Sequence, residues 1–342
     1  MPLTYTPRKR FSPQEYAQAI LAGDRIMLSR AITLIESKLP SDVALAEKVL
    51  EIILPHTGNS LRVGITGVPG VGKSTFIESF GKLITGMGKK LAVLTIDPSS
   101  QRSKGSILGD KTRMESLAND PMAYIRPSAS GATLGGVNNK TRETMLLCEA
   151  AGYEVILIET VGVGQSETTV AEIADFFLLL MLAGAGDELQ GIKKGIMEMA
   201  DALVITKADG DNVTMSQMAA REYANAMRLF PAQDSGWEPE VLTCSSVEQR
   251  GLDAIWDVIV RHHELMCKTG YFQAKRMEQN IAWMNEIIDY YLKYDFLHAP
   301  AVSEVLDFTQ HQVESGKLPA ITAAKRLLER FRGESAEGTD GK

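Results

Sequence analysis

The sequence predicts an α/β protein with a mostly parallel central sheet, flanked by helical extensions at both ends. Seven short apolar runs alternate with helix-length segments between residues 61 and about 247. Strands that are apolar along their whole length are typical of a parallel sheet covered on both faces. The remaining segments have helical patterns, so we divide the chain into residues 1–58, 59–258, 259–332 and a tail, 333–342, that we expect to be disordered.

Composition and charge exclude several classes of protein. The net charge of −7 over 342 residues argues against nucleic-acid binding, which needs a basic face. Cys148, Cys244 and Cys267 lie far apart without a Cys-x-x-Cys pair, so neither a disulfide framework nor a zinc site is indicated. The most apolar run, "FFLLLMLAGAG", is too short to span a bilayer, and the basic N-terminus has no apolar secretory core. We therefore expect a cytoplasmic protein that binds neither membrane nor nucleic acid.

The segment before the sheet predicts three helices. "SPQE" at 12–15 is a capping box, in which Ser12 caps the first helix and Glu15 reaches back to it. Asp24 can cap a second helix, and "PSD" at 40–42 opens a third. We expect these helices to form a small layer of their own.

The seven expected strands end on residues that suit a ligand site. In chain order they read LRVGIT, LAVLTID, MAYIRP, EVILIET, FFLLLML, ALVITK and EVLTCSS. In open parallel sheets, ligands bind beyond the carboxyl ends of the strands. Those ends here carry Gly67, Asp97, Glu159, Lys207 and Ser245.

The region after residue 250 is predicted to be helical. Trp256 falls on the apolar side of an amphipathic helix and is expected in the core, whereas His262 and His263 are expected to form a surface pair. A later helix has a seam of apolar residues at 4-3-4-3 spacing, typical of packed helix pairs. The seam consists of Met277, Ile281, Met284, Ile288 and Tyr291. It could pack within the protomer or form a dimerisation arm, and the pattern leaves both open. A further helix begins near Pro319.

"GVPGVGKST" at 67–75 follows a strand, precedes a helix and matches the phosphate-binding pattern G-x-x-x-x-G-K-[ST]. Backbone N–H groups of such a loop surround the phosphates, and the helix N-terminus adds its dipole. Lys73 would reach the β- and γ-phosphates, and the Ser74 hydroxyl would bind Mg²⁺. The predicted contacts at this loop are Gly67, Val68, Pro69, Gly70, Val71, Gly72, Lys73, Ser74 and Thr75.

"TKAD" at 206–209 follows another strand and matches the guanine-specific pattern [NT]-K-x-D. The Asp209 carboxylate would accept from guanine N1–H and the exocyclic amine, whereas adenine would leave it unpaired. Lys207 would lie along the base plane. A backbone N–H after the next strand could meet guanine O6, which adds Ser245, Ser246 and Val247 to the predicted base site.

The buried strand before Glu159 ends in "ETVG", in the place of a Walker-B or switch element that usually reads D-x-x-G. Glu159 would hold Mg²⁺ directly or through water, and the Gly162 N–H would sense the γ-phosphate. Gln165 lies three residues beyond that glycine, so we treat it as a switch residue and do not assign it the water-orienting role.

Two more segments are candidates for the metal and the attacking water. Asp97 could bind Mg²⁺ or cap the next turn. "SILGDKTRM" at 106–114 is either a first switch, with Asp110 aimed at the metal or the water, or a solvated loop. The glycine-rich loop 126–140 either contacts a partner or is a plain connection. The candidate catalytic residues are Lys73, Asp110 and Glu159.

Together these motifs resemble the MeaB/ArgK-type GTPases, bacterial relatives of the human methylmalonic-aciduria type A protein. The segments that carry the resemblance are GVPGVGKST, DPSS, GDKTRM, RPSASGATLGG, ETVGVGQSE, GAGDELQGIKKGIMEMAD and TKAD. The resemblance implies a homodimeric P-loop GTPase that uses GTP/GDP and Mg²⁺. It also implies that the protein assists adenosylcobalamin-dependent methylmalonyl-CoA mutase in cofactor loading and protection. A third switch is implied at 186–195, with Gln190 and Lys193 as transmitters.

Other functions stay open at this point. A P-loop ATPase or kinase linked to basic amino-acid transport fits "TKAD" poorly. A nickel-delivery GTPase would need a Cys/His site, which three Cys and five His do not suggest. An adaptor that has lost hydrolysis is disfavoured by the intact Lys73, Ser74 and Glu159. We expect slow intrinsic hydrolysis, because neither an arginine finger nor an adjacent glutamine is evident.

Overall fold

The computed structural model describes residues 10–97, 114–129, 136–160, 166–184, 194–231 and 233–333. The chain divides into two compact units, Met1–Gln279 and Asn280–Lys342. The first unit contains the sheet, and the second is helical. Within the described residues, no helix combines the length and the apolar character needed to cross a membrane.

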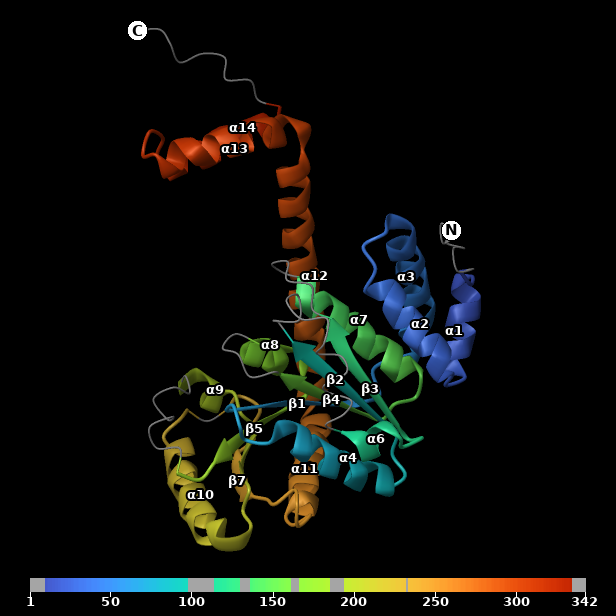
Figure 1. Ribbon diagram of the computed structural model, residues 1–342, viewed down its shortest axis with the longest axis vertical. Helices are drawn as coiled ribbons and strands as arrows, with labels where there is room; N and C mark the ends of the chain where they lie inside the picture. The colour runs from blue at the N-terminus through green and yellow to red at the C-terminus, as the bar shows by residue number, and fades with distance from the viewer. Residues whose placement is uncertain are drawn as a thin grey trace, which may run out of the picture. The chain divides into compact units, whose positions relative to one another are not determined.

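A parallel seven-stranded sheet forms the centre of the first unit (Figure 1). Its strands are β1 (Leu61–Gly67), β2 (Leu91–Asp97), β3 (Ala123–Ala129), β4 (Val155–Thr160), β5 (Phe176–Leu182), β6 (Ala202–Thr206) and β7 (Glu240–Thr243). They lie in the order β3-β2-β4-β1-β5-β6-β7, and every neighbouring pair is parallel. Each predicted apolar run therefore forms one strand, and the predicted α/β fold is confirmed.

Helices between the strands, and one after the last strand, complete the core. They are α4 (Lys73–Gly86), α6 (Glu115–Ala118), α7 (Gly136–Ala150), α8 (Ser166–Ile173), α9 (Lys194–Glu198), the 3₁₀ turn η3 (Gly210–Asn212), α10 (Val213–Met227) and α11 (Leu252–Thr269). From α4, Phe76 and Phe80 are fully buried, and Phe80 packs against Trp256 of α11 with ring centroids 6.2 Å apart. Burying an aromatic side chain of this kind contributes about 2 kcal/mol. The core position predicted for Trp256 is confirmed.

His262 on α11 corrects the prediction of an exposed histidine pair. Its side chain is buried, with its ring edge-on to Phe176 and Trp237 at centroid distances of 5.0 Å. Burial lowers the pKa of His262 to about 3, so the imidazole is neutral. The reason lies in the helical period: His262 continues the inward row of Ile255 and Ile259, while His263 falls beside that row.

The N-terminal helices are α1 (Pro13–Leu21), α2 (Arg25–Ile35) and α3 (Pro40–Ile53), followed by the 3₁₀ turn η1 (Leu54–His56). The capping box is confirmed: Glu15 N donates to Ser12 Oγ over 3.2 Å, and Ser12 N donates to Glu15 Oε2 over 2.7 Å. Asp24 Oδ1 accepts from the first turn of α2, which confirms the second cap. These helices pack on one another and on α7.

α12 (Tyr271–His298) begins in the first unit, where buried charges hold its first turns. Arg276 donates to Asp175 Oδ2 over 2.7 Å and to the carbonyl oxygens of Gly58 and Ser60. Burial alone would raise the pKa of Asp175, but the Arg276 guanidinium outweighs it and holds that pKa below its usual value. The ion pair joins the helix to the amino ends of β1 and β5.

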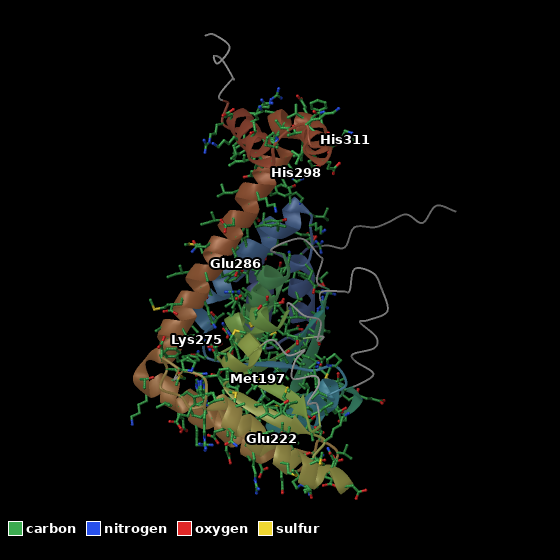
Figure 2. All side chains as sticks on the ribbon, turned by 90° about the vertical axis from the view of Figure 1, so that its left-hand side faces the viewer. Met197, Glu222, Lys275, Glu286, His298 and His311 are labelled. Carbon is green, nitrogen blue, oxygen red and sulfur yellow. The ribbon has the colours of Figure 1, made fainter. Side chains whose placement is uncertain are left out.

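The second unit contains the rest of α12 with α13 (Pro300–Glu314) and α14 (Ala320–Phe331). α14 begins directly after Pro319, as predicted, and Phe331 packs edge-on against Phe296 of α12 at 5.3 Å. Glu286 and His298 lie along α12, and His311 lies on α13 (Figure 2). The residues of the apolar seam on α12 are between 45% and 65% exposed. The tail predicted to be disordered falls outside the described residues from position 334 onward.

Candidate nucleotide site

The loop between β1 and α4 has a backbone that depends on its glycines. Gly70 and Gly72 have φ angles of 77° and 88°, in the left-handed region that side chains rarely adopt. At Gly67, a Cβ atom would lie 2.4 Å from the carbonyl oxygen of Leu180 on β5. The close approach of β1 and β5 thus requires glycine at position 67, and the positive φ angles of the turn favour glycine at positions 70 and 72.

Polar contacts inside this loop hold its shape. Lys73 Nζ donates to the Gly67 carbonyl oxygen over 2.9 Å, so the ammonium group lies over the loop. Thr206 Oγ1, at the end of β6, donates to the Val71 carbonyl oxygen over 2.8 Å. Ser74 and Thr75 occupy the first turn of α4, where backbone N–H groups lack helical partners and attract anions. The arrangement is suited to a phosphate chain.

Lys207 brings the segment after β6 against the same loop. Its φ angle is 56°, an uncommon value for a residue with a side chain, and Nζ donates to the Gly70 carbonyl oxygen over 2.8 Å. Asn212 Nδ2 donates to the Lys207 carbonyl oxygen over 2.7 Å and supports the turn. The "TKAD" segment and the phosphate-loop segment therefore adjoin, although 137 positions separate Lys207 from Gly70.

Asp209 and the segment after β7 line the next part of the candidate site, beside the Lys207 turn. Ser245 Oγ donates to Asp209 Oδ2 over 2.6 Å, and Ala208 N donates to the Cys244 carbonyl oxygen over 3.0 Å. Ser79 of α4 donates to the Ser246 carbonyl oxygen over 2.9 Å, which ties this segment to the helix of the phosphate loop. Val247, beyond these anchors, is 81% exposed.

Cys244 is not a nucleophile in this site. It is buried, and burial, helped by the negative charge of Asp209, raises the pKa of its thiol to about 12. The thiol therefore stays protonated, and the residue packs as a small apolar group.

Glu159 lies on β4, directly beside the strand that leads into the phosphate loop. Its Cα is in register with Ile65 of β1 and with Thr95 of β2, and its side chain is buried at 5% exposure. The next residue, Thr160, forms a 2.8 Å hydrogen bond with Thr66 of β1 through their hydroxyl groups. The carboxylate next to the last residue of this strand thus lies at the carboxyl edge of the sheet.

The oxygen groups at this edge are of the type that Mg²⁺ prefers. Ser74 offers a hydroxyl after β1, and Glu159 offers a carboxylate on the adjacent β4. Asp97 is the last residue of β2, the strand on the other side of β4, and only its backbone is described. Asp110, Gly162, Gln165, Gln190 and Lys193 all lie outside the described residues.

Several residues that position the site were not predicted. Thr206, Ser79 and Asn212 donate to backbone oxygens of the loops, and Arg250 donates to the Ala208 carbonyl oxygen. Thr206 stands inside the "TKAD" motif, so the motif could have drawn attention to it. The contact of Asn212 with Lys207 is local, whereas those of Ser79 and Arg250 become visible only when the strand order is known.

Comparisons with known proteins agree with this geometry. The family model described as methylmalonyl Co-A mutase-associated GTPase MeaB matches residues 28–301. The GTPase ArgK of Escherichia coli is 49% identical over 272 residues, covering 80% of this chain and 82% of that protein. The mitochondrial methylmalonic aciduria type A homolog of Mus musculus is 43% identical over 334 residues, covering 95% and 80%. The crystal structure of a LAO/AO transport system kinase has a TM-score of 0.75 at 38% identity, covering 94% and 97% of the two chains.

Proposed function

Since this chain belongs to the MeaB family of GTPases, we propose that it is a GTP-driven chaperone of adenosylcobalamin-dependent methylmalonyl-CoA mutase. It would assist assembly of the mutase, loading of its cofactor and protection of the loaded enzyme. The observation that carries the proposal is the family match over residues 28–301, whose description names association with the mutase. Binding of guanine nucleotide and hydrolysis of GTP follow from membership of the family.

In the proposed mechanism, GTP lies along the carboxyl edge of the sheet. Backbone N–H groups of residues 67–75 surround the phosphates, and the Lys73 ammonium exchanges the Gly67 carbonyl oxygen for phosphate oxygens. The Asp209 carboxylate, oriented by the Ser245 hydroxyl, reads guanine, and the Lys207 stem lies along the base. The backbone of Ser245, Ser246 and Val247 then faces guanine O6.

We propose that Ser74 and Glu159 hold Mg²⁺, together with Asp97 and Asp110. When bound, the ion would balance negative charge that develops on the phosphates during transfer to water. The buried position of Glu159 suits this role, because a carboxylate removed from water is stabilised by a cation beside it. Lys73, Asp110 and Glu159 remain the proposed catalytic residues.

The signal to the mutase is proposed to pass through segments next to the phosphates. Gly162 and Gln165 lie between β4 and α8, and Gln190 and Lys193 lie between β5 and α9. A γ-phosphate that orders these segments would change the surface offered to the partner. Intrinsic hydrolysis would be slow, with the partner completing the site.

A homodimer is proposed through the seam on α12. Ile281, Met284, Ile288 and Tyr291 repeat at coiled-coil spacing and are at least 45% exposed. An apolar stripe of this length on one helix is stabilised when a second helix covers it. A second copy of the same chain supplies a matching stripe.

Co-precipitation tests the mutase proposal. Purified protein and methylmalonyl-CoA mutase are mixed with GDP, with a non-hydrolysable GTP analogue, or without nucleotide, and the rate of GTP hydrolysis is measured with and without the mutase. We expect a complex whose yield depends on the nucleotide, and hydrolysis that is faster in the presence of the mutase. An Asp209→Asn variant serves as the matched control, because it should lose the nucleotide effect while keeping its fold.

No complex under any nucleotide condition, together with equal hydrolysis rates, would overturn the chaperone role. The GTPase assignment would survive that result, because it does not depend on the partner.

A further inference from the structure

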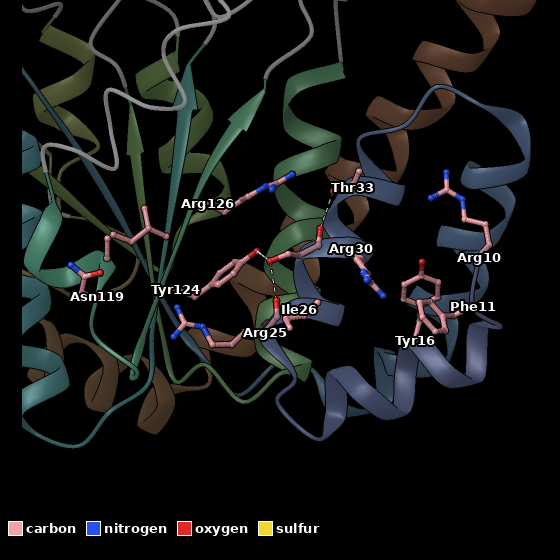
Figure 3. Close-up of a pocket in the computed structure, with 13 residues that line it drawn as sticks. Arg10, Phe11, Tyr16, Arg25, Ile26, Arg30, Thr33, Asn119, Tyr124 and Arg126 are labelled. Atoms are coloured by element: carbon pink, nitrogen blue, oxygen red, sulfur yellow. Dashed lines mark hydrogen bonds between the residues drawn. The ribbon is translucent and has the colours of Figure 1, made fainter. Parts of the chain in front are cut away.

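A cavity of about 1090 Å³ lies between the N-terminal helices and the edge strand β3, away from the phosphate loop. Its walls come from the start of α1, one face of α2, the end of α6 and β3. In Figure 3, Arg126 and Tyr124 of β3 point toward α2, whereas Arg30 of α2 points toward Phe11 and Tyr16. β3 and β1 are separated in the sheet by β2 and β4, so this cavity is distinct from the nucleotide site.

Among the residues that the structure describes, those that line this cavity include positively charged side chains and no negatively charged ones. The described residues that line it include Arg10, Arg25, Arg30 and Arg126, and none of them is Asp or Glu. The chain as a whole has a net charge of −7. Guanidinium groups here that are not already paired with a carboxylate would attract an anion.

Two of these arginines are paired and two are not. Arg10 forms an ion pair with Asp42 at 2.6 Å, and Arg126 forms one with Glu36. For Arg25 and Arg30, no carboxylate comes within ion-pair distance in the part of the chain that the structure describes. These two guanidinium groups are the charges that a ligand could use.

Of the two, Arg30 forms fewer hydrogen bonds within the described residues. Its guanidinium carbon lies 5.4 Å from the centre of the Phe11 ring, and Nη1 lies 3.9 Å from Met27 Sδ. Both contacts leave most of its five N–H donors for another acceptor. Arg25 instead donates to the carbonyl oxygens of Ala123 and Pro121, at 2.7 and 3.5 Å.

Aromatic rings and hydroxyl groups complete the lining. Phe11 and Tyr16 pack edge to face at 5.6 Å on one side, and Tyr124 lies on the other. The Tyr124 hydroxyl forms a 3.0 Å hydrogen bond with Ser29 of α2. Planar rings beside unpaired guanidinium groups suit a ligand that combines an aromatic ring with phosphates.

We propose that this cavity is a second ligand site, which takes a phosphorylated small molecule with an aromatic ring, of the nucleotide class. The phosphates bind Arg30, and the ring lies against Phe11. The volume is close to the upper limit for small-molecule pockets. An extended protein segment fits less well, because Arg25 already occupies the Ala123 carbonyl oxygen at the edge of β3 that such a segment would pair with.

Equilibrium dialysis of labelled ADP against the full chain tests the proposal. The protein is first saturated with GDP, so that the phosphate loop is filled, and the readout is additional binding of ADP. We expect one further site, and an affinity reduced roughly tenfold or more in Arg30→Ala, the loss typical of a charge-assisted hydrogen bond. Arg228→Ala is the matched control, because Arg228 is exposed on the distant end of α10 and its loss removes the same charge.

Displacement of ADP by other molecules tests which ligand the cavity prefers, and photo-crosslinking tests where that ligand binds. Adenosine and inorganic phosphate should each displace ADP only weakly, and photo-crosslinked 8-azido-ADP should label peptides within 10–33 or 114–129. Absence of additional ADP binding, or equal affinity in Arg30→Ala with an unchanged melting temperature, would overturn the proposal. Displacement of ADP by an acidic peptide but not by ATP would also overturn it and would assign the cavity to a protein partner.

Discussion

Ser245 donates its hydroxyl hydrogen to Asp209 Oδ2 over 2.6 Å, which joins the segments that follow β7 and β6. The serine is fully buried, and its Oγ also accepts from Glu248 N over 3.1 Å. The Asp209 carboxylate is thereby held in one orientation by a group that cannot move away. A fixed acceptor of this kind can discriminate between bases, because a poorly matched base leaves it unpaired.

Asp209→Asn should weaken GDP binding roughly 100-fold, because the neutral amide accepts one hydrogen bond where the carboxylate accepts two. Asn can still accept from Ser245, so we expect the fold to be unchanged. The variant should bind xanthosine diphosphate better than the original protein does, since its N–H₂ group matches the 2-oxo group of xanthine. Calorimetric titration measures both affinities.

Asp211→Asn is the control for this change, because Asp211 is exposed in η3, two positions away. Equal losses of GDP affinity in the two variants would contradict the role given to Asp209.

Gly67→Ala should destabilise the protein by about 2 kcal/mol or more and reduce nucleotide binding. The new methyl group would lie 2.4 Å from the Leu180 carbonyl oxygen, so β1 and β5 must separate. Gly86→Ala, at the end of α4, meets no atom within 4 Å and should be neutral or stabilising by about 0.5 kcal/mol. Urea denaturation followed by circular dichroism compares the two, and a Gly67→Ala variant as stable as Gly86→Ala would refute the steric argument.

Glu143 on α7 should make stability depend on pH. Burial raises the pKa of its carboxyl group from 4.5 to about 7, with Lys140 opposing and Glu47 reinforcing the shift. Because the folded state holds this proton more tightly than the unfolded state, the stabilising contribution is complete below pH 4.5 and is lost as the pH rises through 7.

Glu143→Gln should therefore raise the free energy of unfolding by up to about 3 kcal/mol at pH 8 and leave it nearly unchanged at pH 4. Denaturation series at the two pH values measure the difference. Glu51→Gln, at an exposed position on α3, is the control with the same loss of charge. A constant difference between Glu143→Gln and the original protein across this range would be inconsistent with the raised pKa.

Met284→Glu together with Ile288→Glu should convert the proposed dimer into a monomer, because two buried charges without partners would face each other across the seam. Sedimentation velocity at micromolar concentration measures the oligomeric state. Ala282→Glu adds a charge at an exposed position of the same helix outside the seam and should leave the dimer intact. If the unmodified protein is already monomeric, the dimer proposal fails directly.

The elements predicted most accurately depend on short-range patterns. The seven strands, the Ser12–Glu15 capping box and the loop before α4 each follow from a few consecutive residues, whose backbone preferences and burial agree. The carboxyl-edge location of Gly67 and Glu159 also follows, because all strands of a parallel sheet end on the same side.

Features that depend on strand order could not be predicted from the sequence. The Ser245–Asp209 hydrogen bond needs β6 beside β7, and the arginine cavity needs α2 beside β3. In each case the decisive contact joins segments whose proximity no local pattern specifies. The burial of His262 is a different case, because it continues the helical row of Ile255 and Ile259 on α11 and could have been predicted from that period.

Displacement of a fluorescent GDP analogue from the purified protein tests the central claim most directly, namely that the loops after β1, β6 and β7 form one guanine-nucleotide site. We predict that unlabelled GDP and GTP displace the analogue at stoichiometric concentrations, that ATP requires at least roughly 100-fold more, and that Asp209→Asn removes this preference. Equal displacement by ATP and GTP, or no binding of the analogue to folded protein, would contradict the account.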